Sequence, residues 1–262
     1  MIFAPPATTL EAQNLGFSRR NTGPILENIS FTAERGKKIA LLGANGCGKT
    51  TLLSLLGGRL SPAQGKVLIH GSPLAALSLR ATAGEIAFLP QIERLPFNYK
   101  VLDFVLLGRA PHVGAFSLPG PRDREKALEA LEELELTDIA QRGAGELSGG
   151  EFQLVRLARC LSQEARILLL DEPTSLLDPA NAARIGEVIS NLADRGKTIL
   201  FATHDVALSQ FVADEAILLA DRRILARGPV GRILEADLLD EAFGVKFGLA
   251  SIPIAFGTRL AR

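Results

Sequence analysis

Eight consecutive residues could hold a phosphate group. The run Gly43-Ala44-Asn45-Gly46-Cys47-Gly48-Lys49-Thr50 fits the phosphate-binding pattern G-x-x-x-x-G-K-[ST]. Its glycines would let the backbone close around a phosphate where a Cβ would clash. We expect Lys49 to reach the β- and γ-phosphates of a nucleotide and the Thr50 hydroxyl to ligate Mg²⁺. A glycine-rich turn that binds nothing is the alternative for this run taken alone.

Two adjacent carboxylates end an apolar run later in the chain. The stretch RILLLDE (166–172) predicts a buried strand that ends in Asp171 and Glu172. Sheets of α/β proteins place their ligands at the C-terminal ends of such strands. Neighbouring buried carboxylates repel one another, so they are costly unless a cation lies beside them. Mg²⁺ would supply that cation.

A second glycine turn precedes a predicted helix. Leu147-Ser148-Gly149-Gly150-Glu151 leads into FQLVRLARCLSQ, whose apolar residues recur at helical spacing. The Ser-Gly-Gly turn therefore lies at a helix N-terminus, where free N–H groups and the helix dipole favour an anion. A plain helix cap is the alternative.

Three further side chains each have a functional and an ordinary interpretation. Gln91, at the end of a predicted strand, could ligate Mg²⁺ or orient water, or it could be a solvated loop residue. His204 follows another strand, and a lone histidine there is more often structural than catalytic. Phe17 could stack on a purine or pack in the core, and the pattern alone favours neither.

The elements that must position these residues alternate along the chain. The phosphate-binding run lies between an expected strand at 37–42 and an expected helix at 50–56, which Gly57 and Gly58 end. Short β-like runs at 10–42 and 65–71 predict a small antiparallel sheet beside the nucleotide. The other expected elements are strands at 84–91, 166–172, 197–203, 216–220 and 223–226, and helices at 101–108, 123–136, after 205 and at 235–244. The helix at 123–136 would present apolar residues 127, 128, 131 and 134 opposite a charged face.

Composition narrows the class of protein. The chain of 262 residues is 47% hydrophobic and 22% charged, as in ordinary soluble globular proteins. Lys+Arg and Asp+Glu number 29 each, so there is no basic excess to indicate a nucleic-acid partner. No apolar run approaches the length of a membrane span, and no secretory signal is visible. Two cysteines, Cys47 and Cys160, provide no disulfide framework, and we expect a cytosolic location.

The order of these motifs resembles that of ABC-type ATPase domains. The matching pieces are the phosphate-binding P-loop, Gln91, LSGGE, ILLLDEP and His204, and the resemblance covers roughly residues 10–245. It implies an α/β fold: a P-loop NTPase core with a RecA-like mixed sheet, a small antiparallel β subdomain and an inserted α-helical subdomain. We therefore expect a single ABC ATPase domain over 1–262. Its expected parts are a nucleotide-binding core at 10–90 and 164–245, a helical subdomain at 91–163 and a C-terminal tail at 246–262.

The resemblance also implies roles for single residues. Lys49 would hold the phosphates of ATP, and Glu172 would polarise the attacking water as a general base. His204 resembles the switch histidine, and Gln91 the residue that links Mg²⁺ and water to the transporter contact. The implied Mg²⁺ ligands are Thr50, Gln91 and Asp171. The implied nucleotide contacts are Phe17, which resembles the adenine-stacking aromatic, Gly43, Ala44, Asn45, Gly46, Cys47, Gly48, Lys49, Thr50, Thr51, Ser148, Gly149, Gly150, Glu151, and Asp178 of the D-loop-like stretch 175–178.

In that family the P-loop and the LSGG turn face each other across a head-to-tail dimer. The resemblance therefore implies a homodimer with two composite sites, each made of 43–50 from one chain and 148–151 from the other. A C₂ dimer would form both sites at once. One residue departs from the pattern: Phe152 stands where family members usually carry a basic or polar residue, which puts the local packing in doubt.

The segment LPFNYKVLDFVLLGRAPHVGAF and the LLDEAFGV end are similar to ATPase subunits of importers for iron chelates, haem, cobalamin or oxyanions such as molybdate. This similarity implies transmembrane permease subunits docked near residues 91–120 and, indirectly, a substrate-binding protein, with the chain peripheral on the cytoplasmic face of the inner membrane. The apolar residues of that segment could equally be core; they are Leu95, Phe97, Val101, Leu102 and Phe104. A soluble ABC ATPase that acts as an iron–sulfur assembly scaffold or switch is the alternative. A module that binds ATP without cleaving it is disfavoured by Glu172 and His204.

Two residues with reactive or ligating side chains stand outside this set. A thiolate at Cys47 would be favoured by the helix N-terminus, so a thiol reagent would inactivate the free enzyme and ATP would protect it. A buried inert thiol is the alternative. His112 has no nearby Cys or His partner in the sequence, so we expect a loop residue and not a metal ligand.

Overall fold

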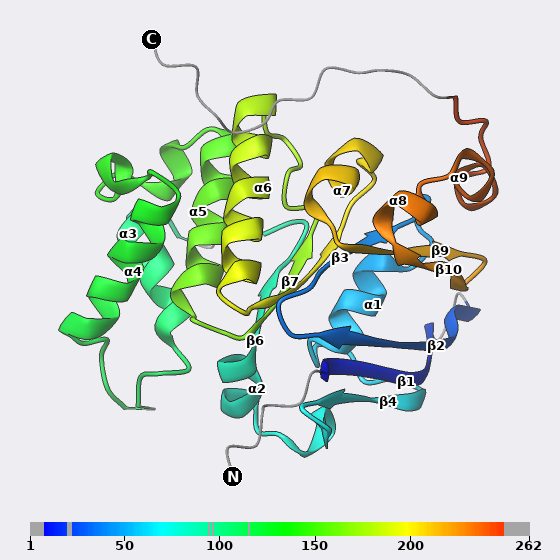
Figure 1. The fold of residues 1–262 in the computed structure, drawn as a ribbon. Coiled ribbons are helices and arrows are strands. Elements are labelled where there is room, and N and C mark those ends of the chain that lie inside the picture. Colours follow the sequence, from blue (N-terminus) through cyan, green and yellow to red (C-terminus); the bar gives the residue numbers. More distant parts are fainter. Residues whose placement is uncertain (1–7, 20–22, 94, 96, 115, 249–262) are drawn as a thin grey trace.

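Two sheets form the frame of the protein (Figure 1). The computed structural model describes residues 8–19, 23–93, 95, 97–114 and 116–248. The larger, six-stranded sheet has the order β10-β9-β3-β8-β7-β6 and is parallel except for β10, which pairs antiparallel with β9. The four-stranded sheet, β2-β1-β4-β5, is antiparallel. The predicted α/β class, with a mixed main sheet and a separate antiparallel sheet, is confirmed.

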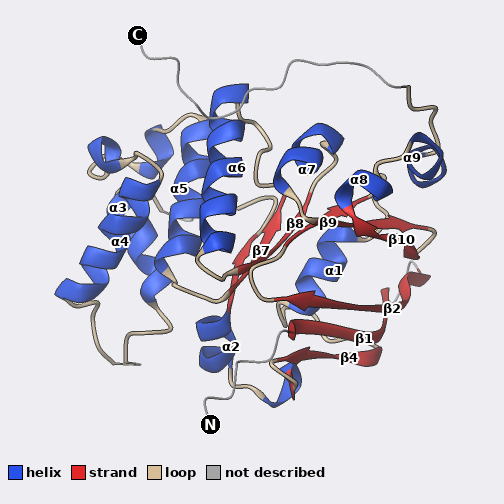
Figure 2. Ribbon diagram, viewed as in Figure 1, coloured by secondary structure: helices blue, strands red, loops and turns tan. Residues whose placement is uncertain are grey.

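Figure 2 distinguishes the helices from the strands. The strands are β1 Thr8–Arg19, β2 Gly23–Glu34, β3 Lys38–Leu42, β4 Gln64–Ile69, β5 Ser72–Pro73, β6 Ile86–Leu89, β7 Ile167–Asp171, β8 Thr198–Ala202, β9 Glu215–Ala220 and β10 Arg223–Pro229. The helices are α1 Lys49–Leu56, α2 Leu79–Glu85, α3 Val101–Leu106, α4 Pro121–Glu133, α5 Gly149–Ser162, α6 Pro179–Asp194, α7 Val206–Val212, α8 Val230–Ile233 and α9 Ala236–Phe243.

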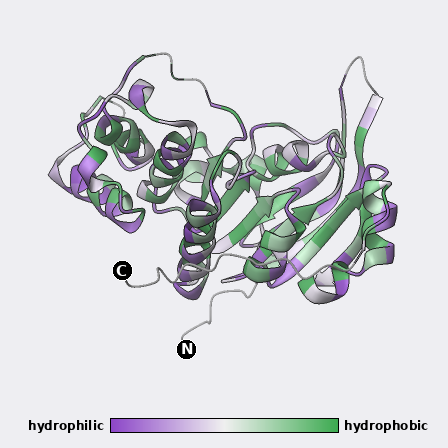
Figure 3. Ribbon diagram, turned by 90° about the horizontal axis from the view of Figure 1, so that it is seen from above, coloured by the Kyte–Doolittle hydropathy of each residue, from purple (hydrophilic) through white to green (hydrophobic). Residues whose placement is uncertain are grey.

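Both faces of the main sheet are buried, which is why its strands read as continuous apolar runs. On β3, Ile39 and Leu41 pack into a core shared with α1 and the antiparallel sheet. Ala40 and Leu42 face the opposite core, to which α3 to α9 contribute. Figure 3 shows these apolar strands between helices whose outer surfaces carry many hydrophilic residues. Helix α1 therefore lies between the two sheets, with its N-terminus at the C-terminal end of β3.

Helices α3, α4 and α5 pack together at one side of the molecule (Figure 1). Three of the four predicted apolar positions of α4 and its C-cap, Ala127, Leu131 and Leu134, are buried. Leu128, the fourth apolar position, is 36% exposed, and the helix contacts its neighbours through a narrower stripe that includes Ala130. The division into a core at 10–90 and 164–245 and a helical subdomain at 91–163 stays a prediction.

Some elements differ from those expected. Residues 84 and 85 belong to α2 and not to the predicted strand at 84–91, because Ser78 caps a helix there by accepting a hydrogen bond from the Ala81 N–H at 3.2 Å. Helices α2, α6 and α8 were not predicted, and the helix expected at 101–108 ends at Leu106 and continues as a 3₁₀ turn. Residues 249–262 of the predicted tail lie outside the described residues. In the described ranges, no helix has the length and apolar character that crossing a membrane would need.

Candidate functional site

The glycine loop between β3 and α1 is held in a conformation that side chains would disfavour. Gly43, Gly46 and Gly48 have φ of 145°, 81° and 109°. A Cβ at Gly43 would lie 2.3 Å from the carbonyl oxygen of Leu219, and one at Gly48 would lie 2.7 Å from a methyl group of Leu26. Two of the glycines are therefore required by close packing against the chain itself, in addition to any phosphate, whereas Gly46 faces open space.

Helix α1 begins at this loop with its N–H groups available. Within the described residues, Gly48 supplies no capping side chain and the first turn has no acidic residue. The buried Lys49 curls over the loop, where its Nζ donates hydrogen bonds to the carbonyls of Gly43 at 2.7 Å and Ala44 at 3.1 Å. A free helix N-terminus beside an ammonium group is suited to an anion such as phosphate.

The two predicted carboxylates lie at the end of β7, and both are buried. Asp171 is 1% exposed and Glu172 is 6% exposed. Burial raises the pKa of Asp171; the Thr50 hydroxyl opposes this rise by hydrogen bonding, and the charge of Glu172 adds to it. The Gln91 backbone N–H also interacts with the Asp171 carboxyl group. The structure therefore brings Thr50, Asp171 and the backbone of Gln91 together, while the Gln91 residue itself is exposed.

Thr50 and Asp171 fit a bound Mg²⁺. Oδ2 of Asp171 is buried and has no hydrogen-bond partner among the described residues, and a hydroxyl and a carboxylate are oxygen ligands of the kind Mg²⁺ prefers. No cluster of three or more His, Cys, Asp or Glu that could hold a metal occurs in the described ranges.

Glu172 and His204 meet because β7 and β8 are neighbours, with Asp171 paired to Ala202. The Nδ1 atom of His204 lies 3.1 and 3.0 Å from the two carboxylate oxygens of Glu172. Glu172 has a φ of 52°, in the left-handed region, and its backbone N–H donates to the Ala202 carbonyl at 2.9 Å. A strained backbone held at a buried carboxylate is a feature typical of functional sites.

The Ser148 turn is a capping box at the start of α5. The Ser148 hydroxyl accepts a hydrogen bond from the Glu151 N–H at 3.2 Å, and the Glu151 carboxylate accepts one from the Ser148 N–H at 2.8 Å. The second bond lowers the pKa of Glu151. The helix-cap interpretation therefore describes the single chain, and anion binding by Ser148, Gly149, Gly150 and Glu151 stays a prediction.

The D-loop-like stretch lies against this turn. A Cβ built on Gly149 lies 3.8 Å from the Leu176 side chain, and one built on Gly150 lies 3.3 Å from that of Leu177. Asp178 caps α6 by accepting from the Asn181 N–H at 2.9 Å, so its carboxylate already has a structural use and its nucleotide contact stays a prediction.

Two of the remaining predictions concern residues close to the P-loop. Phe17 is half-buried and packs against the core beside α1, which agrees with its core interpretation and leaves purine stacking a prediction. Cys47 is half-buried, and burial raises the pKa of its thiol above the ordinary value, although the charge of Lys49 opposes this. Of the two interpretations of Cys47, the buried inert thiol is therefore the one that this environment favours, because desolvation is the largest influence on the thiol pKa.

Comparison with known proteins decides the family. A sequence model described as ABC transporter matches residues 26–175. The chain belongs to the ABC transporter family. The molybdate import ATP-binding protein MolC of Haemophilus influenzae is 37% identical over 235 residues, which cover 89% of this chain and 87% of that protein. The hemin import ATP-binding protein HmuV of Bordetella pertussis is 37% identical over 261 residues, which cover 96% and 98%. The manganese transport ATP-binding protein MntB of Listeria monocytogenes is 36% identical over 233 residues, which cover 88% and 92%.

Solved structures agree with the ABC fold. An inward-facing metal-chelate type ABC transporter matches with a TM-score of 0.80 and 35% identity over 91% of this chain and 90% of that one. A dimeric bacterial ABC transporter cassette matches with a TM-score of 0.76 and 26% identity over 84% and 98%. The predicted family and its ATPase activity are confirmed, and the chain is an ATP-binding ABC ATPase. These import and transport proteins give no support to the iron–sulfur scaffold alternative.

The segment after Gln91 divides between core and surface. Val101, Leu102 and Phe104 are buried and Leu95 packs against them, whereas Phe97 is 69% exposed. Phe152, the departure from the ABC pattern, packs its ring 5.7 Å from that of Phe104, so this position is filled by aromatic packing. The Nε2 atom of His112 lies 2.8 Å from the Gln163 carbonyl oxygen, in keeping with an ordinary loop residue.

Sequence reasoning missed two buried polar residues of α5, Gln153 and Arg156. Their spacing of three places them on one helix face among apolar neighbours, and a polar pair on an otherwise buried face is the signal that could have revealed them.

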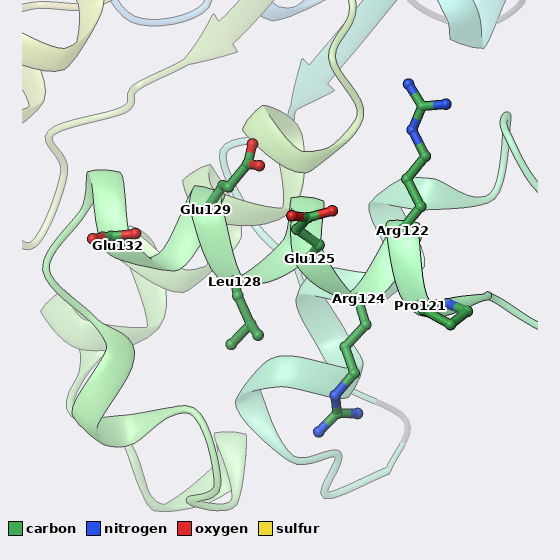
Figure 4. Close-up of a pocket in the computed structure, with 7 residues that line it drawn as sticks. All are labelled: Pro121, Arg122, Arg124, Glu125, Leu128, Glu129 and Glu132. Carbon is green, nitrogen blue, oxygen red and sulfur yellow. The ribbon is translucent and has the colours of Figure 1, made fainter.

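Two hollows on the ABC domain lie away from the nucleotide residues. A groove of about 250 Å³ lies between β6, α5 and the turn after α3, and Arg59, Phe88, Leu107, Arg159 and Gln163 are among the residues that line it. Figure 4 shows a second hollow along α4, lined by Pro121, Arg122, Arg124, Glu125, Leu128, Glu129 and Glu132. None of the residues predicted to contact nucleotide appears in either lining.

Proposed function

We propose that this chain is the ATP-hydrolysing subunit of an ABC importer that takes up a metal chelate or a related substrate, such as an iron–siderophore, haem, cobalamin or a molybdate-type oxyanion. The observation that carries the proposal is the meeting of Lys49, Thr50, Asp171, Glu172 and His204 at the C-terminal ends of β3, β7 and β8. Similar proteins are named for molybdate, hemin and manganese, so importer ATPase is supported more strongly than any one substrate.

The residues divide the work of hydrolysis between them. The amides of 43–51 and the Lys49 ammonium bind the phosphates of ATP. Thr50 and Asp171, with Gln91 reaching from its loop, would hold Mg²⁺, which neutralises charge on the β- and γ-phosphates when bound. Glu172 accepts a proton from the attacking water as its oxygen bonds to the γ-phosphorus and the bond to ADP breaks. The His204 contact at 3.0 Å fixes the orientation of that carboxylate.

We propose that ATP is bound between two copies arranged head to tail. The P-loop of one copy and Ser148–Glu151 of the other each offer a helix N-terminus to the phosphates. Ser148 and Gly149 are exposed in the single chain, so a second copy could contact them. A dimeric cassette of similar fold supports this arrangement. Phe17 would stack on the adenine and Asp178 would lie at the dimer contact.

The permease, we propose, docks on the region of 91–120, with the chain peripheral on the cytoplasmic face of the inner membrane and a substrate-binding protein joined only through the permease. Four large apolar side chains on this region are strongly exposed: Ile92, Phe97, Phe116 and Leu118. The neighbouring groove carries Arg59 and Arg159 beside Phe88, so it could accept a short cytoplasmic segment with apolar and acidic residues.

Glu172→Gln tests the catalytic assignment, with the exposed Glu187→Gln on α6 as the matched control. Because the amide cannot accept the proton, turnover falls by about 10² to 10⁴-fold while MgATP binding persists. The variant forms a stable ATP-bound dimer in size-exclusion chromatography, and Glu187→Gln behaves as wild type. Near-normal turnover by Glu172→Gln would contradict the assignment.

Purification of the full chain from detergent-solubilised membranes tests the importer assignment. We expect a multi-helix permease to accompany the chain in stoichiometric amount. Recovery of all the chain in the soluble fraction, with no membrane protein attached, would contradict that part of the proposal and leave the ATPase assignment standing.

A further inference from the structure

Two polar side chains on the buried face of α5 have no part in the nucleotide contacts described above. Gln153 is 3% exposed and Arg156 is 4% exposed. A guanidinium group carries its charge at any physiological pH, so its burial is costly unless every donor finds a partner. The hydrogen-bond partners of Gln153 and Arg156 therefore indicate the role of the two side chains.

Arg156 forms hydrogen bonds with the loop that carries Gln91. Its Nη2 donates to the Pro90 carbonyl and its Nη1 donates to the Gln91 carbonyl at 3.4 Å. Its Nε donates to the Glu93 carboxylate at 3.2 Å. Arg159, one turn further along α5, lies 2.8 Å from the same carboxylate. The loop is thus bound to α5 through backbone oxygens on one side and through an ion pair on the other.

Gln153 connects Arg156 to the residues that follow β7. Its Oε1 accepts from Nη1 of Arg156 at 2.5 Å, and its Nε2 donates to the carbonyls of Glu172 at 3.2 Å and Pro173 at 3.0 Å. One connected set of hydrogen bonds therefore runs from the Gln91 loop through α5 to the peptide of Glu172. Strands β6 and β7 are neighbours, with Leu89 paired to Leu170, so the two ends that the set joins leave the sheet side by side.

The geometry of the guanidinium group makes this set a positioning device. Its nitrogens lie in a fixed plane, so the acceptors on the Gln91 loop and the Gln153 amide oxygen on α5 together define both its place and its orientation. If the loop moved alone, the half-buried Pro90 carbonyl and Glu93 carboxylate would lose these donors, and the buried guanidinium group would lose most of its partners. The Gln91 loop cannot shift relative to Glu172 without breaking several of these bonds together.

We propose that Arg156 is a positioning residue for ATP hydrolysis, which acts by holding the Gln91 loop in register with Glu172 through Gln153. The inference rests on the proposed function, because it assigns Arg156 a part in that same reaction. Arg156 does not touch substrate. Its effect on turnover passes through the placement of the Gln91 side chain, where a shift of about 1 Å can cost about a hundredfold in rate.

A double-mutant cycle tests this route. Arg156→Lys keeps the charge and loses the planar fork, and Gln91→Ala removes the side chain through which Arg156 acts. Arg109→Lys is the matched control: Arg109 is equally buried and ion-paired to Asp123 and Glu164, but it contacts neither the Gln91 loop nor Glu172. The full chain is assayed for kcat and KM with MgATP, and thermal unfolding is followed for every variant.

We expect Arg156→Lys to lower kcat about ten- to a hundredfold with KM changed less than about twofold, as for an interaction realised only in the transition state. In the Gln91→Ala background the same substitution lowers kcat less than about threefold. Arg109→Lys leaves kcat near that of its own parent, wild type or Gln91→Ala, whatever it does to the melting temperature. Should Arg156→Lys fail to fold, Gln153→Met takes its place in the cycle, because it removes the amide contacts at similar volume.

Equal losses from Arg156→Lys with and without the Gln91 side chain would overturn the inference, and so would equal effects of Arg156→Lys and Arg109→Lys. Where Gln153→Met replaces Arg156→Lys in the cycle, equal losses in the two backgrounds would overturn the inference as well. A wild-type chain that hydrolyses no ATP would refute the proposed function instead, so the two failures are distinguishable.

Discussion

The buried carboxylate of Asp171 destabilises the nucleotide-free fold. Its carboxylate is 1% exposed, its Oδ2 has no hydrogen-bond partner among the described residues, and the charge of the buried Glu172 is next to it. Burial raises its pKa, so the ionised form is disfavoured in the folded chain. Replacing Asp171 by Asn removes the charge at nearly constant volume and leaves an oxygen that can accept from Thr50 or from the Gln91 N–H. The nucleotide-free Asp171→Asn chain should therefore be more stable than wild type.

The size of this gain follows from the unpaired atom. An unsatisfied buried polar group costs about 1–3 kcal/mol, and more when it is charged. The asparagine amide still lacks one partner, so we expect a net gain of about 1–2 kcal/mol. In a chain of this size 1 kcal/mol moves the melting temperature by about 2–4 °C, which gives a rise of about 2–8 °C. The assay is thermal unfolding at pH 7.5 with a metal chelator and no nucleotide, and Asp194→Asn, at an exposed position of α6, is the control.

The pH dependence has a definite sign. A carboxyl group whose folded pKa is raised binds more protons in the folded state, so its ionisation destabilises the fold as pH rises through the folded pKa. Below the unfolded value, about 4, both states are protonated and this penalty disappears. The advantage of Asp171→Asn should therefore shrink as the pH is lowered from 7.5 toward 4.

With MgATP present, wild type should be more stable than Asp171→Asn. A ligand at about 100 times its Kd stabilises the folded state by about 2.7 kcal/mol. Wild type should gain this stabilisation, and Asp171→Asn should lose most of the magnesium-dependent part. An apo Asp171→Asn chain that melts at or below the wild-type temperature would refute the reasoning. A variant that gains as much as wild type from MgATP would refute the assignment of Asp171 to the ion.

The local structure at the P-loop and at Ser148 depends on short sequence patterns. An apolar strand that ends in a glycine loop, and a serine followed three residues later by Glu151, each specify a structure within a few residues, and the structure has both. Helix α2 lacks such a pattern, because it buries no residue. Leu128 fitted the helical spacing, yet which part of an apolar stripe is covered depends on the neighbouring helices.

Contacts between distant segments could not be obtained in this way. His204 reaches Glu172 because β8 lies beside β7, and Arg156 reaches Pro90 because α5 packs against β6. Strand order is set by packing of the whole sheet and leaves no local sequence pattern. Cys47 shows the same limit for electrostatics: its place at a helix N-terminus is local, but the burial that raises its pKa is decided by the fold.

Two further predictions concern the P-loop itself. Gly43→Ala should lower the free energy of unfolding by several times the roughly 1 kcal/mol expected for Gly46→Ala. Both glycines have positive φ, but only a Cβ at Gly43 would lie 2.3 Å from a backbone oxygen. Equal losses of stability in urea unfolding would contradict the packing argument. Cys47 should react with a thiol reagent at pH 7 more slowly than the same residue in urea-unfolded chain, because burial raises its pKa and little thiolate is present. A Cys160→Ala background isolates Cys47 in that assay, and the native rate should increase at a more alkaline pH than the unfolded rate. A folded chain that reacts as fast as the unfolded one would mean that the helix N-terminus and Lys49 outweigh desolvation at this thiol.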